Sequence, residues 1–359
     1  MNQNKFVPRL IAWELTRTCN LDCIHCRAAA SMGPYEGELT TEEIFRILEE
    51  ITEVSHPVII LTGGEPLLRK DLLDIARKAV SLGLKPVLAT NGTLLTPELA
   101  RELKEAGISR VSISLDGASP QSHDNFRKMP GAFEGAMRGI RILKEVGLPF
   151  QINTTITAVN AEELPKVHEL AKSLGAVAHH IFLLVPVGRG KELSEESLSP
   201  EKYEALLHWF YEQREKSGLH LKATCAPHYY RIMRERARAE GKEVTYETFG
   251  LDAVTRGCLA GVGFCFISHR GIVQTCGYLE IPCGDLRKNT FKEIWENSEV
   301  FNKLRNFSLY KGKCGKCEYI RVCGGCRARA YEAKGDYLEE EPLCTYQPKK
   351  AEALSQKSA

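Results

Sequence analysis

Apolar positions in the first half of the chain follow two spacings, one typical of buried strands and one typical of amphipathic helices. Between about residues 41 and 54, for example, apolar side chains recur three and four residues apart, which is the spacing of one helical face. Predicted helices cover 41–54, 71–82, 97–106, 133–146, 161–174 and 200–216. Short apolar runs lie between them, and we predict strands at 10–16, 58–62, 85–89, 108–115, 150–157 and 178–185.

Strands and helices therefore alternate about every 25–35 residues, which predicts right-handed βαβ units and a parallel sheet. A full eight-unit barrel takes about 250 residues, whereas this alternation fades after about residue 187. We predict an α/β fold, a partial (β/α)6 barrel of the TIM type that is open on one side and followed by a cysteine-rich C-terminal domain.

The later segments differ from the barrel in composition. The polar stretch 188–197 is flanked by glycine and predicts a loop. Residues 231–243 are dense in Arg, Lys and Glu, and we interpret them as a solvated helix or connector. We divide the chain into an N-terminal extension, the barrel, a connector, the cysteine-rich domain and a flexible tail, at 1–8, 9–225, 226–256, 257–348 and 349–359.

The overall composition excludes several classes of protein. Of the 359 residues, 43% are hydrophobic and 26% are charged, as in an ordinary enzyme. A formal net charge of +2 argues against a nucleic-acid or anionic-membrane partner. The longest apolar runs are too short to span a bilayer, and the N-terminal residues contain no apolar signal segment. We expect a cytoplasmic protein and take it to be a monomer.

Three of the thirteen cysteines, Cys19, Cys23 and Cys26, fall within eight residues. In a cytoplasmic enzyme such cysteines indicate metal binding or catalysis rather than disulfides. Their spacing, C-x3-C-x2-C, follows the first predicted strand, so they lie at its carboxyl end, where α/β barrels place their chemistry. Three thiolates can hold a four-iron cluster and leave one iron open, whereas a closed zinc site takes four ligands. The alternatives are a zinc knuckle or plain buried thiols.

A second motif, Gly63-Gly64-Glu65-Pro66, follows the second predicted strand. Paired glycines let a ligand approach the backbone closely. A three-cysteine loop after the first strand and GGEP after the second resemble the radical S-adenosylmethionine (SAM) enzymes. The resemblance implies a [4Fe-4S] cluster on the three cysteines, whose open iron chelates the amino and carboxylate groups of SAM. It also implies that the GGEP backbone and its glutamate hold the methionine amine.

The C-terminal domain holds a second group of cysteines, several of them in closely spaced pairs. They are Cys258, Cys265, Cys276, Cys314, Cys317, Cys323, Cys326 and Cys344. A C-x2-C turn puts two sulfurs on one side of a tight loop, and eight thiols can fill two four-iron clusters. The alternative is one zinc ribbon at 314–326, with the other thiols structural.

This second group resembles the SPASM extension of radical SAM enzymes, which carries auxiliary [4Fe-4S] clusters. The resemblance implies two of them, or at least one. The implied inner ligands are Cys258, Cys265, Cys276 and Cys326, and the outer ligands are Cys314, Cys317, Cys323 and Cys344. The family usually has three residues between the last two cysteines of the run, whereas this chain has two, so the partition stays open. Cys225 and Cys283 are left over, each a core thiol or a replacement ligand.

Further phrases resemble one group of these enzymes, the haem b synthases of the alternative, sirohaem-derived pathway. The phrases lie at 151–157, 178–185, 222–230 and 323–331. The resemblance implies oxidative decarboxylation of two propionates of iron-coproporphyrin III to vinyl groups, with an external electron donor and acceptor. Our hypothesis is that the auxiliary clusters take up the electron that remains after CO2 has left.

Three alternatives stay open. A SPASM peptide maturase would modify a peptide or protein side chain, but only about ten residues precede the first strand, too few for a peptide-binding domain. A related haem-pathway enzyme would remove acetate side chains from didecarboxysirohaem or act toward haem d1. A non-catalytic iron–sulfur or zinc protein would have no use for an open iron beside GGEP.

Residues near the predicted strand ends are candidates for binding SAM. Ser114 and Asp116 share one side of the fourth strand, and the resemblance implies that they bind the ribose hydroxyls; the alternative for Asp116 is a turn cap. Asn153 presents a similar choice. Arg127 pairs either with the SAM carboxylate or in a surface salt bridge. His25 stands where many relatives have an aromatic residue near adenine.

An iron porphyrin with four carboxylates needs cationic partners, and arginine pairs with carboxylates through two hydrogen bonds. Arg27 and Arg189 are the candidates at the barrel mouth. The candidate axial iron ligands and pocket residues are His179, His180, His228, Tyr229 and Tyr230. For each of them the alternative is a structural role in the core.

Overall fold

The computed structural model describes residues 6–193 and 197–349. Most of the predicted extension at 1–8, nearly all of the predicted tail at 349–359 and the end of the loop at 188–197 lie outside the described residues. In the part of the chain that is described, no helix is both long and apolar enough to cross a membrane.

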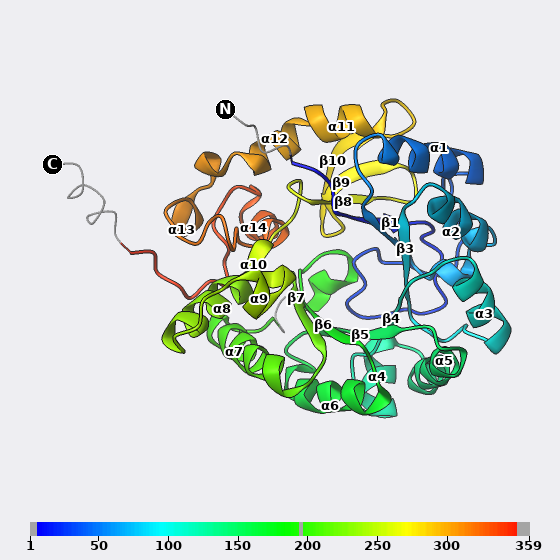
Figure 1. Ribbon diagram of the computed structural model, residues 1–359, viewed down its shortest axis with the longest axis horizontal. Coiled ribbons are helices and arrows are strands. Elements are labelled where there is room, and N and C mark those ends of the chain that lie inside the picture. Colours follow the sequence, from blue (N-terminus) through cyan, green and yellow to red (C-terminus); the bar gives the residue numbers. More distant parts are fainter. Residues whose placement is uncertain (1–5, 194–196, 350–359) are drawn as a thin grey trace.

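All six predicted strands are present and pair in parallel. They are β1 (Leu10–Glu14), β2 (Val58–Thr62), β3 (Lys85–Thr90), β4 (Val111–Ser114), β5 (Phe150–Ile156) and β6 (Ala178–Leu183). The predicted helices are α1 (Thr41–Thr52), α2 (Leu72–Ser81), α3 (Pro97–Glu105), α5 (Ala132–Val146), α6 (Leu164–Leu174) and α7 (Pro200–Lys216), and a short α4 (Pro120–Arg127) is added. The helices form an outer ring around the strands (Figure 1).

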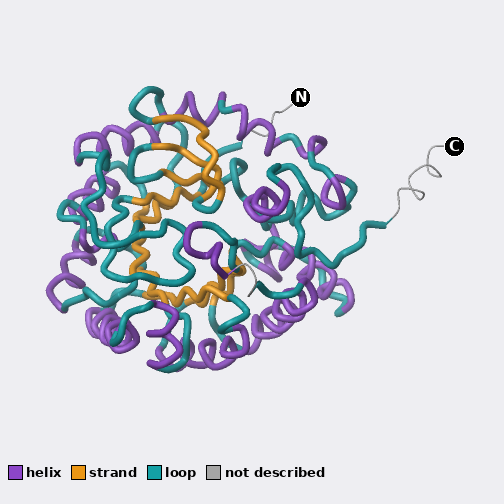
Figure 2. Tube along the Cα trace, turned by 180° about the vertical axis from the view of Figure 1, so that it is seen from behind, coloured by secondary structure: helices purple, strands orange, loops and turns teal. Residues whose placement is uncertain are grey.

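The sheet is wider than the six strands that the apolar pattern predicts. The four further strands are β7 (His220–Thr224), β8 (Phe264–Ile267), β9 (Ile272–Cys276) and β10 (Leu279–Asp285). β7 pairs in parallel with β6, and β8 pairs in parallel with β1, while β9 and β10 are antiparallel. The strand order β10-β9-β8-β1-β2-β3-β4-β5-β6-β7 has two edges, so the barrel stays open as predicted. Figure 2 shows the strands as an arc with helices outside it.

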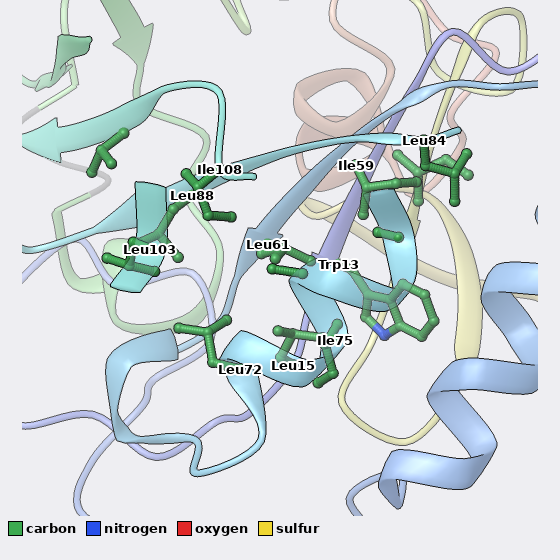
Figure 3. Close-up of a cluster of buried hydrophobic side chains, with 14 of the residues drawn as sticks. Trp13, Leu15, Ile59, Leu61, Leu72, Ile75, Leu84, Leu88, Leu103 and Ile108 are labelled. Atoms are coloured by element: carbon green, nitrogen blue, oxygen red, sulfur yellow. The ribbon is translucent and has the colours of Figure 1, made fainter. Parts of the chain in front are cut away.

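Side-chain alternation along each strand separates an outer face, covered by helices, from an inner face. In β2, Ile59 and Leu61 are fully buried, whereas Val58, Ile60 and Thr62 are half-buried. Figure 3 shows the outer core, where the two fully buried residues lie with Trp13 of β1 and with Leu72 and Ile75 of α2. Burying each such side chain contributes about 1.5–3 kcal/mol. The outer core therefore holds the barrel together and leaves the inner face available for polar groups.

The C-terminal region lies beside the open side of the barrel (Figure 1). Its helices are α8 (His228–Ala239), α9 (Tyr246–Phe249), α10 (Leu251–Val254), α11 (Phe291–Asn297), α12 (Glu299–Arg305), α13 (Gly312–Gly315) and α14 (Arg327–Lys334). The short 3-10 helices are η1 (Pro66–Leu68), η2 (Ala161–Glu163), η3 (Gly188–Leu193) and η4 (Phe307–Leu309). Arg329 of α14 donates from Nη2 to the carbonyl oxygens of Leu184 at 3.2 Å and Cys225 at 2.9 Å, and so ties this region to the ends of β6 and β7.

Candidate functional site

The loop after β1 brings three thiols together, those of Cys19, Cys23 and Cys26. The backbone N–H of Leu21 donates to Sγ of Cys19 at 3.4 Å. The N–H of Ala30 donates to Sγ of Cys26, also at 3.4 Å. Arg127 donates from Nη1 to Sγ of Cys23 at 3.5 Å. Hydrogen bonds to sulfur are one of the ways in which proteins set the properties of cysteine-bound clusters, so this loop fits a group held through sulfur.

Burial keeps the thiols of Cys19 and Cys23 protonated as long as nothing is bound to them. It raises the pKa of Cys19 to about 12, and the negative charges of Glu65 and of the neighbouring thiolates act in the same direction. Burial also raises the pKa of Cys23, against the opposing effect of Arg127. A coordinated metal deprotonates a thiol outright. The charge of the loop therefore depends on whether its metal group is bound.

Gly63 and Gly64 connect β2 to this loop. A β-carbon on Gly63 would stand 2.4 Å from the carbonyl oxygen of Thr16, and one on Gly64 would stand 2.5 Å from that of Thr18. The N–H of Gly64 donates to Thr16 O at 2.7 Å, and the N–H of Glu65 donates to Thr18 O at 2.8 Å. In the structure the glycines thus permit the close approach of the thiol loop itself, whereas the sequence argument assigned them to a ligand.

Glu65 is fully buried and orders the end of β3. Its Oε1 accepts hydrogen bonds from Thr90 Oγ1 at 2.7 Å and from Leu67 N at 3.1 Å, and its Oε2 accepts one from Asn91 N at 2.8 Å. Burial raises the pKa of this carboxyl, and the three hydrogen bonds oppose the rise. Pro66 follows as the first residue of η1. The GGEP turn is therefore built into the thiol loop on one side and β3 on the other.

Arg127 and Asp116 form a buried ion pair, so the predicted surface salt bridge is wrong. The carboxylate of Asp116 also accepts a hydrogen bond from Thr155 N at 2.7 Å, on the neighbouring strand β5, and therefore does not cap its own turn. Asp116 and the nearby Cys23 raise the pKa of Arg127 although burial opposes this. The guanidinium is thus a permanent positive charge directly beside a thiol of the loop.

Arg189 of η3 holds the thiol loop from the other side. It donates from Nε to the carbonyl oxygen of Cys23 at 2.8 Å and from Nη1 to that of Ala30 at 3.0 Å. Its Nη1 also pairs with Asp22 at 2.9 Å. These contacts use Nε and Nη1, whereas Nη2 is buried with no hydrogen-bond partner in the described structure. The role of Arg189 as an anchor for a substrate carboxylate therefore stays a prediction. Arg189 is a positioning residue for the loop.

Four half-buried polar residues form a row on the inner face of the sheet. They are Ser114, Asn153, His180 and Lys222, which pair in register across β4, β5, β6 and β7. Register partners on parallel strands point the same way, so the row places three predicted residues together. Lys222 was not a candidate, although it opens the phrase 222–230 that carried part of the resemblance. Its Nζ makes no hydrogen bond or ion pair with a described residue.

His180 is a hydrogen-bond donor toward the inner face. Arg110 donates to Gln151 Oε1 at 3.3 Å, which fixes the amide so that its Nε2 faces His180 Nδ1 at 2.9 Å. Because an amide nitrogen only donates, Nδ1 must accept, and the proton of the neutral ring lies on Nε2. That Nε2 has no hydrogen-bond partner in the structure. In this tautomer Nε2 donates, but the tautomer depends on the orientation of the Gln151 amide. The predicted role of His180 as an axial ligand stays a prediction.

His179 points to the outer face, because it is one residue away from His180. In register it joins Ile113, Ile152 and Leu221, all of which are buried. Its ring bonds to Thr154 Oγ1 at 2.9 Å and to His168 Nδ1 at 3.0 Å. Burial lowers its pKa to about 3. The alternative that the sequence left open, a structural histidine, is correct, and the predicted iron ligand is wrong.

His228 and Tyr229, at the start of α8, are also remote from the inner face of the barrel. Tyr229 is buried in the core that α7 and α8 share, beside Phe210 and Tyr230, so its predicted pocket role is wrong. His228 is fully buried with neither ring nitrogen hydrogen-bonded, and it lines a hollow in the C-terminal region. The predicted role of His228 as a porphyrin ligand stays a prediction.

Two residues of the thiol loop remain near the positions that the sequence predicted. The ring of His25 lies 4.6 Å from that of Phe126. The guanidinium of Arg27 lies over the ring of Phe266, 4.4 Å from its centre, and 3.9 Å from the carboxylate of Glu14. Arg27 therefore keeps a cation at the junction of the thiol loop and β8, beside the inner face.

The predicted outer thiols come together around the hollow that His228 lines. They are Cys314, Cys317, Cys323 and Cys344. Arg327 Nη2 and Glu341 N both donate to Sγ of Cys314 at 3.4 Å, and Gly325 N donates to Sγ of Cys323 at 3.4 Å. The hollow is thus lined by four thiols, two of which already accept hydrogen bonds, as in the loop after β1.

The predicted inner set is wrong in one member, Cys265. This residue is fully buried in the outer core and lies opposite Ile11 in the register of β1 and β8. Ile267 pairs with Val273 across β8 and β9. Cys265 and Ile267 are two positions apart and share a face, whereas Cys276 is three positions beyond Val273 and points to the opposite face. Cys265 and Cys276 therefore cannot bind one cluster.

Within the described residues, no group of three or more His, Cys, Asp or Glu side chains is arranged to hold a metal ion. The thiols of a four-iron cluster each bind a different iron and stand farther apart than the ligands of one ion.

Two family models match the chain. Residues 13–172 match the radical SAM superfamily, and residues 258–327 match SPASM, an iron-sulfur cluster-binding domain. An AdoMet-dependent heme synthase of Methanosarcina barkeri is 57% identical over 343 residues, 96% of this chain and 98% of that protein. The one of Oleidesulfovibrio alaskensis is 55% identical, over 97% of this chain and 90% of its own. A Fe-coproporphyrin III synthase of Methanosarcina barkeri is 32% identical, over 93% of this chain and 87% of that protein.

Solved structures share the fold. SuiB of Streptococcus suis bound to S-adenosylmethionine superposes with a TM-score of 0.75 at 15% identity, over 95% of this chain and 78% of that one. Native anSMEcpe with bound AdoMet gives a TM-score of 0.67 at 22% identity, over 92% of this chain and 94% of that one. At these identities the likeness concerns the fold alone.

Proposed function

The chain belongs to the family of AdoMet-dependent heme synthases, radical SAM enzymes with a SPASM domain, and we propose that it converts two propionates of iron-coproporphyrin III to vinyl groups, giving haem b. The observation that carries the proposal is the loop of three thiols, two buried and one half-buried, each of which accepts a hydrogen bond. With its cluster and SAM (AdoMet) bound, the site supplies reductive SAM cleavage and a 5′-deoxyadenosyl radical that removes a hydrogen atom from the propionate.

In this proposal Cys19, Cys23 and Cys26 bind the [4Fe-4S] cluster, and the GGEP turn supports the methionine part of SAM. Ser114 and Asn153, which are neighbours in register, are proposed to bind the ribose hydroxyls. Asp116 and Arg127 are engaged with each other, so their proposed contribution is to position the loop and its charge rather than to contact SAM directly.

Electron balance requires a route into and out of the protein. Each propionate loses one hydrogen atom, CO2 and one electron when it becomes a vinyl group, while each SAM cleavage takes up one electron. We therefore propose an external electron donor and an electron acceptor, with the two C-terminal thiol sets as the outlet. The small net charge of +2 supports the proposal that neither nucleic acid nor a membrane is a partner. We further propose that the protein is a cytoplasmic monomer.

The inner-face cations are proposed to bind the propionates that stay in the product. A carboxylate that leaves as CO2 loses its charge, so an ion pair with it stabilises the ground state more than the transition state and slows the reaction. The propionates that are retained carry no such penalty. Lys222 Nζ and the Nε2–H of His180 lie next to each other in register and suit one such carboxylate, and Arg27 suits another.

One anaerobic assay tests the proposal. The cluster-loaded protein is incubated with SAM, dithionite and iron-coproporphyrin III, and haem b and 5′-deoxyadenosine are quantified. We expect haem b, with one 5′-deoxyadenosine for each vinyl group. If 5′-deoxyadenosine forms without haem b, the substrate is wrong, and didecarboxysirohaem and peptides become the substrates to test. If neither product forms, the enzyme reading is wrong.

A further inference from the structure

Cys225 stands directly after β7 in an unusual backbone conformation. Its φ is +55°, and only two other non-glycine residues in the described part of the chain, Ala29 and Lys128, have a positive φ. Ala29 lies in the loop of the first three thiols, and Lys128 follows Arg127. Residues with a β-carbon seldom adopt this conformation, and they do so mainly at functional sites.

The chain around Cys225 is in direct contact with the segment that carries Cys258. A β-carbon on Gly257 would stand 2.5 Å from Cα of Pro227, so the two backbones touch between these thiols. The N–H of Cys258 in turn donates to the carbonyl oxygen of Cys323 at 3.0 Å. Cys258 therefore lies between the end of β7 and the second run of cysteines.

Two more thiols share the surroundings of Cys225. Cys326 is buried in one small apolar cluster, and both Cys225 and Cys276 pack against it. Cys276 also packs against the cluster that Cys258 contacts. Burial raises the pKa of Cys225 well above its ordinary value, and the thiolates of Cys326, Cys276 and Cys258 act in the same direction. Four thiols thus converge from four separate segments.

One buried ion pair sets the positions of Cys225 and Cys326 relative to each other. Arg329 donates from Nη2 to the carbonyl oxygen of Cys225 at 2.9 Å and pairs through Nη1 with Glu341 at 3.1 Å. The same carboxylate accepts the N–H of Cys326 at 2.7 Å. Tyr203 Oη also donates to the carbonyl oxygen of Cys225, at 3.3 Å.

We propose that Cys225 is the fourth thiolate ligand of the inner auxiliary cluster, together with Cys258, Cys276 and Cys326. It takes the place that the sequence argument assigned to Cys265, whose side chain lies on the other face of β8. The proposal rests on the part of the proposed function that places iron–sulfur clusters in the C-terminal region. It makes the barrel itself, through β7, a contributor to the auxiliary site.

The test removes the first cluster and compares two single cysteines. In a parent with Cys19, Cys23 and Cys26 all changed to alanine, we measure iron and sulfide per chain and the EPR spectrum after dithionite reduction. Two auxiliary clusters predict about eight irons. Cys225→Ala is expected to lower the iron content and change one of the two EPR signals, whereas Cys265→Ala keeps the values of the parent. Iron loss with Cys265→Ala but not with Cys225→Ala would overturn the assignment.

Two further measurements separate a ligand from a merely structural thiol. Added 2-mercaptoethanol should shift the EPR signal of the Cys225→Ala protein alone, because only there is an auxiliary iron open. Cys225→Ser keeps the size of the side chain, so its far-UV circular dichroism spectrum should match that of the parent while one EPR signal shifts. An unchanged EPR signal, or loss of the folded circular dichroism spectrum, contradicts the proposal. If the triple-alanine parent binds zinc instead of iron, the cluster premise is wrong. If the parent binds its clusters but the wild-type protein makes no haem b, only the proposed function is wrong.

Discussion

The guanidinium of Arg127 donates a hydrogen bond to the thiol sulfur of Cys23, 3.5 Å away, while its other amino group pairs with the buried carboxylate of Asp116. A charge on α4, more than a hundred residues further along the chain, thereby supports the first thiol loop. The pair connects the loop after β1 to the end of β4, the two places where SAM is proposed to bind.

Arg127→Met should destabilise the fold strongly, since it leaves the carboxylate of Asp116 buried without a cationic partner. Breaking such a pair costs about 3–5 kcal/mol. The double variant Asp116→Asn/Arg127→Met should recover part of this loss because no uncompensated charge remains. Urea unfolding under anaerobic conditions measures the free energy of unfolding of the single variants and of the double variant. Strictly additive effects of the two substitutions would show that the residues do not depend on each other.

Gly64→Ala should displace the thiol loop, because its β-carbon would stand 2.5 Å from the carbonyl oxygens of Arg17 and Thr18. We expect loss of most of the iron bound by the first cluster and at least a tenfold drop in 5′-deoxyadenosine formation. Gly263→Ala is the matched control, since its nearest neighbour would be 3.7 Å away. Full iron content in Gly64→Ala would mean that the loop tolerates the displacement.

Arg189→Met tests whether this residue positions the loop or binds substrate. The substitution removes hydrogen bonds to the carbonyl oxygens of Cys23 and Ala30, so the first cluster should be bound less completely. For the fraction that keeps its cluster, KM for iron-coproporphyrin III should stay within twofold of the wild type. A raised KM with full cluster loading would support the substrate-anchor interpretation.

His179 should make stability depend on pH. Its pKa is about 3 in the folded protein against an ordinary value of 6.5, so the folded state binds fewer protons between these values. The contribution of His179 to stability is therefore fully present well above pH 6.5 and is lost below it, at a rate that approaches about 1.4 kcal/mol per pH unit. Urea unfolding at pH 6.5 and 5.5 should show a loss of about 1 kcal/mol from this residue, and His179→Gln should reduce the dependence on pH. His56→Gln, at an exposed site, is the control and should leave the slope unchanged.

Lys222→Met should weaken substrate binding with little effect on chemistry. A hydrogen bond to a charged group contributes about 1.5–3 kcal/mol, so KM for iron-coproporphyrin III should rise about tenfold to a hundredfold. A contact with a retained propionate is equal in ground and transition states, so kcat should stay nearly constant. Lys85→Met, at the exposed start of β3, serves as the control. A fall in kcat at constant KM would place Lys222 at a reacting carboxylate instead.

Local features of the chain were predictable in detail. The capping box of Thr40 and Glu43 and the buried positions Ile44, Ile47 and Ile51 define α1 as the sequence indicated. The six strands agree as well, because their apolar runs depend on neighbouring residues alone. β8 was missed because its partner β1 lies at the other end of the chain, so no local pattern in the sequence predicts this strand.

Two adjacent histidines show most clearly what the sequence could not predict. His179 and His180 have the same chemistry and stand in the same apolar run, so the sequence treated them alike. Strand alternation sends one to the helices and the other to the inner face, and the register with β5 and β7 supplies their different neighbours. The role of each ring follows from these neighbours.

Spacing along the chain was enough to predict the thiol loop, the GGEP turn, the strand–helix alternation and the family. The fold was needed to show which thiols meet, which arginines hold the thiol loop and which polar side chains share the inner face. A ligand set depends on the face to which each side chain points and on contacts between distant segments, and neither can be read from local spacing. Cys225 and Cys326 meet through such contacts, and Cys265 is turned away by the pleat of β8.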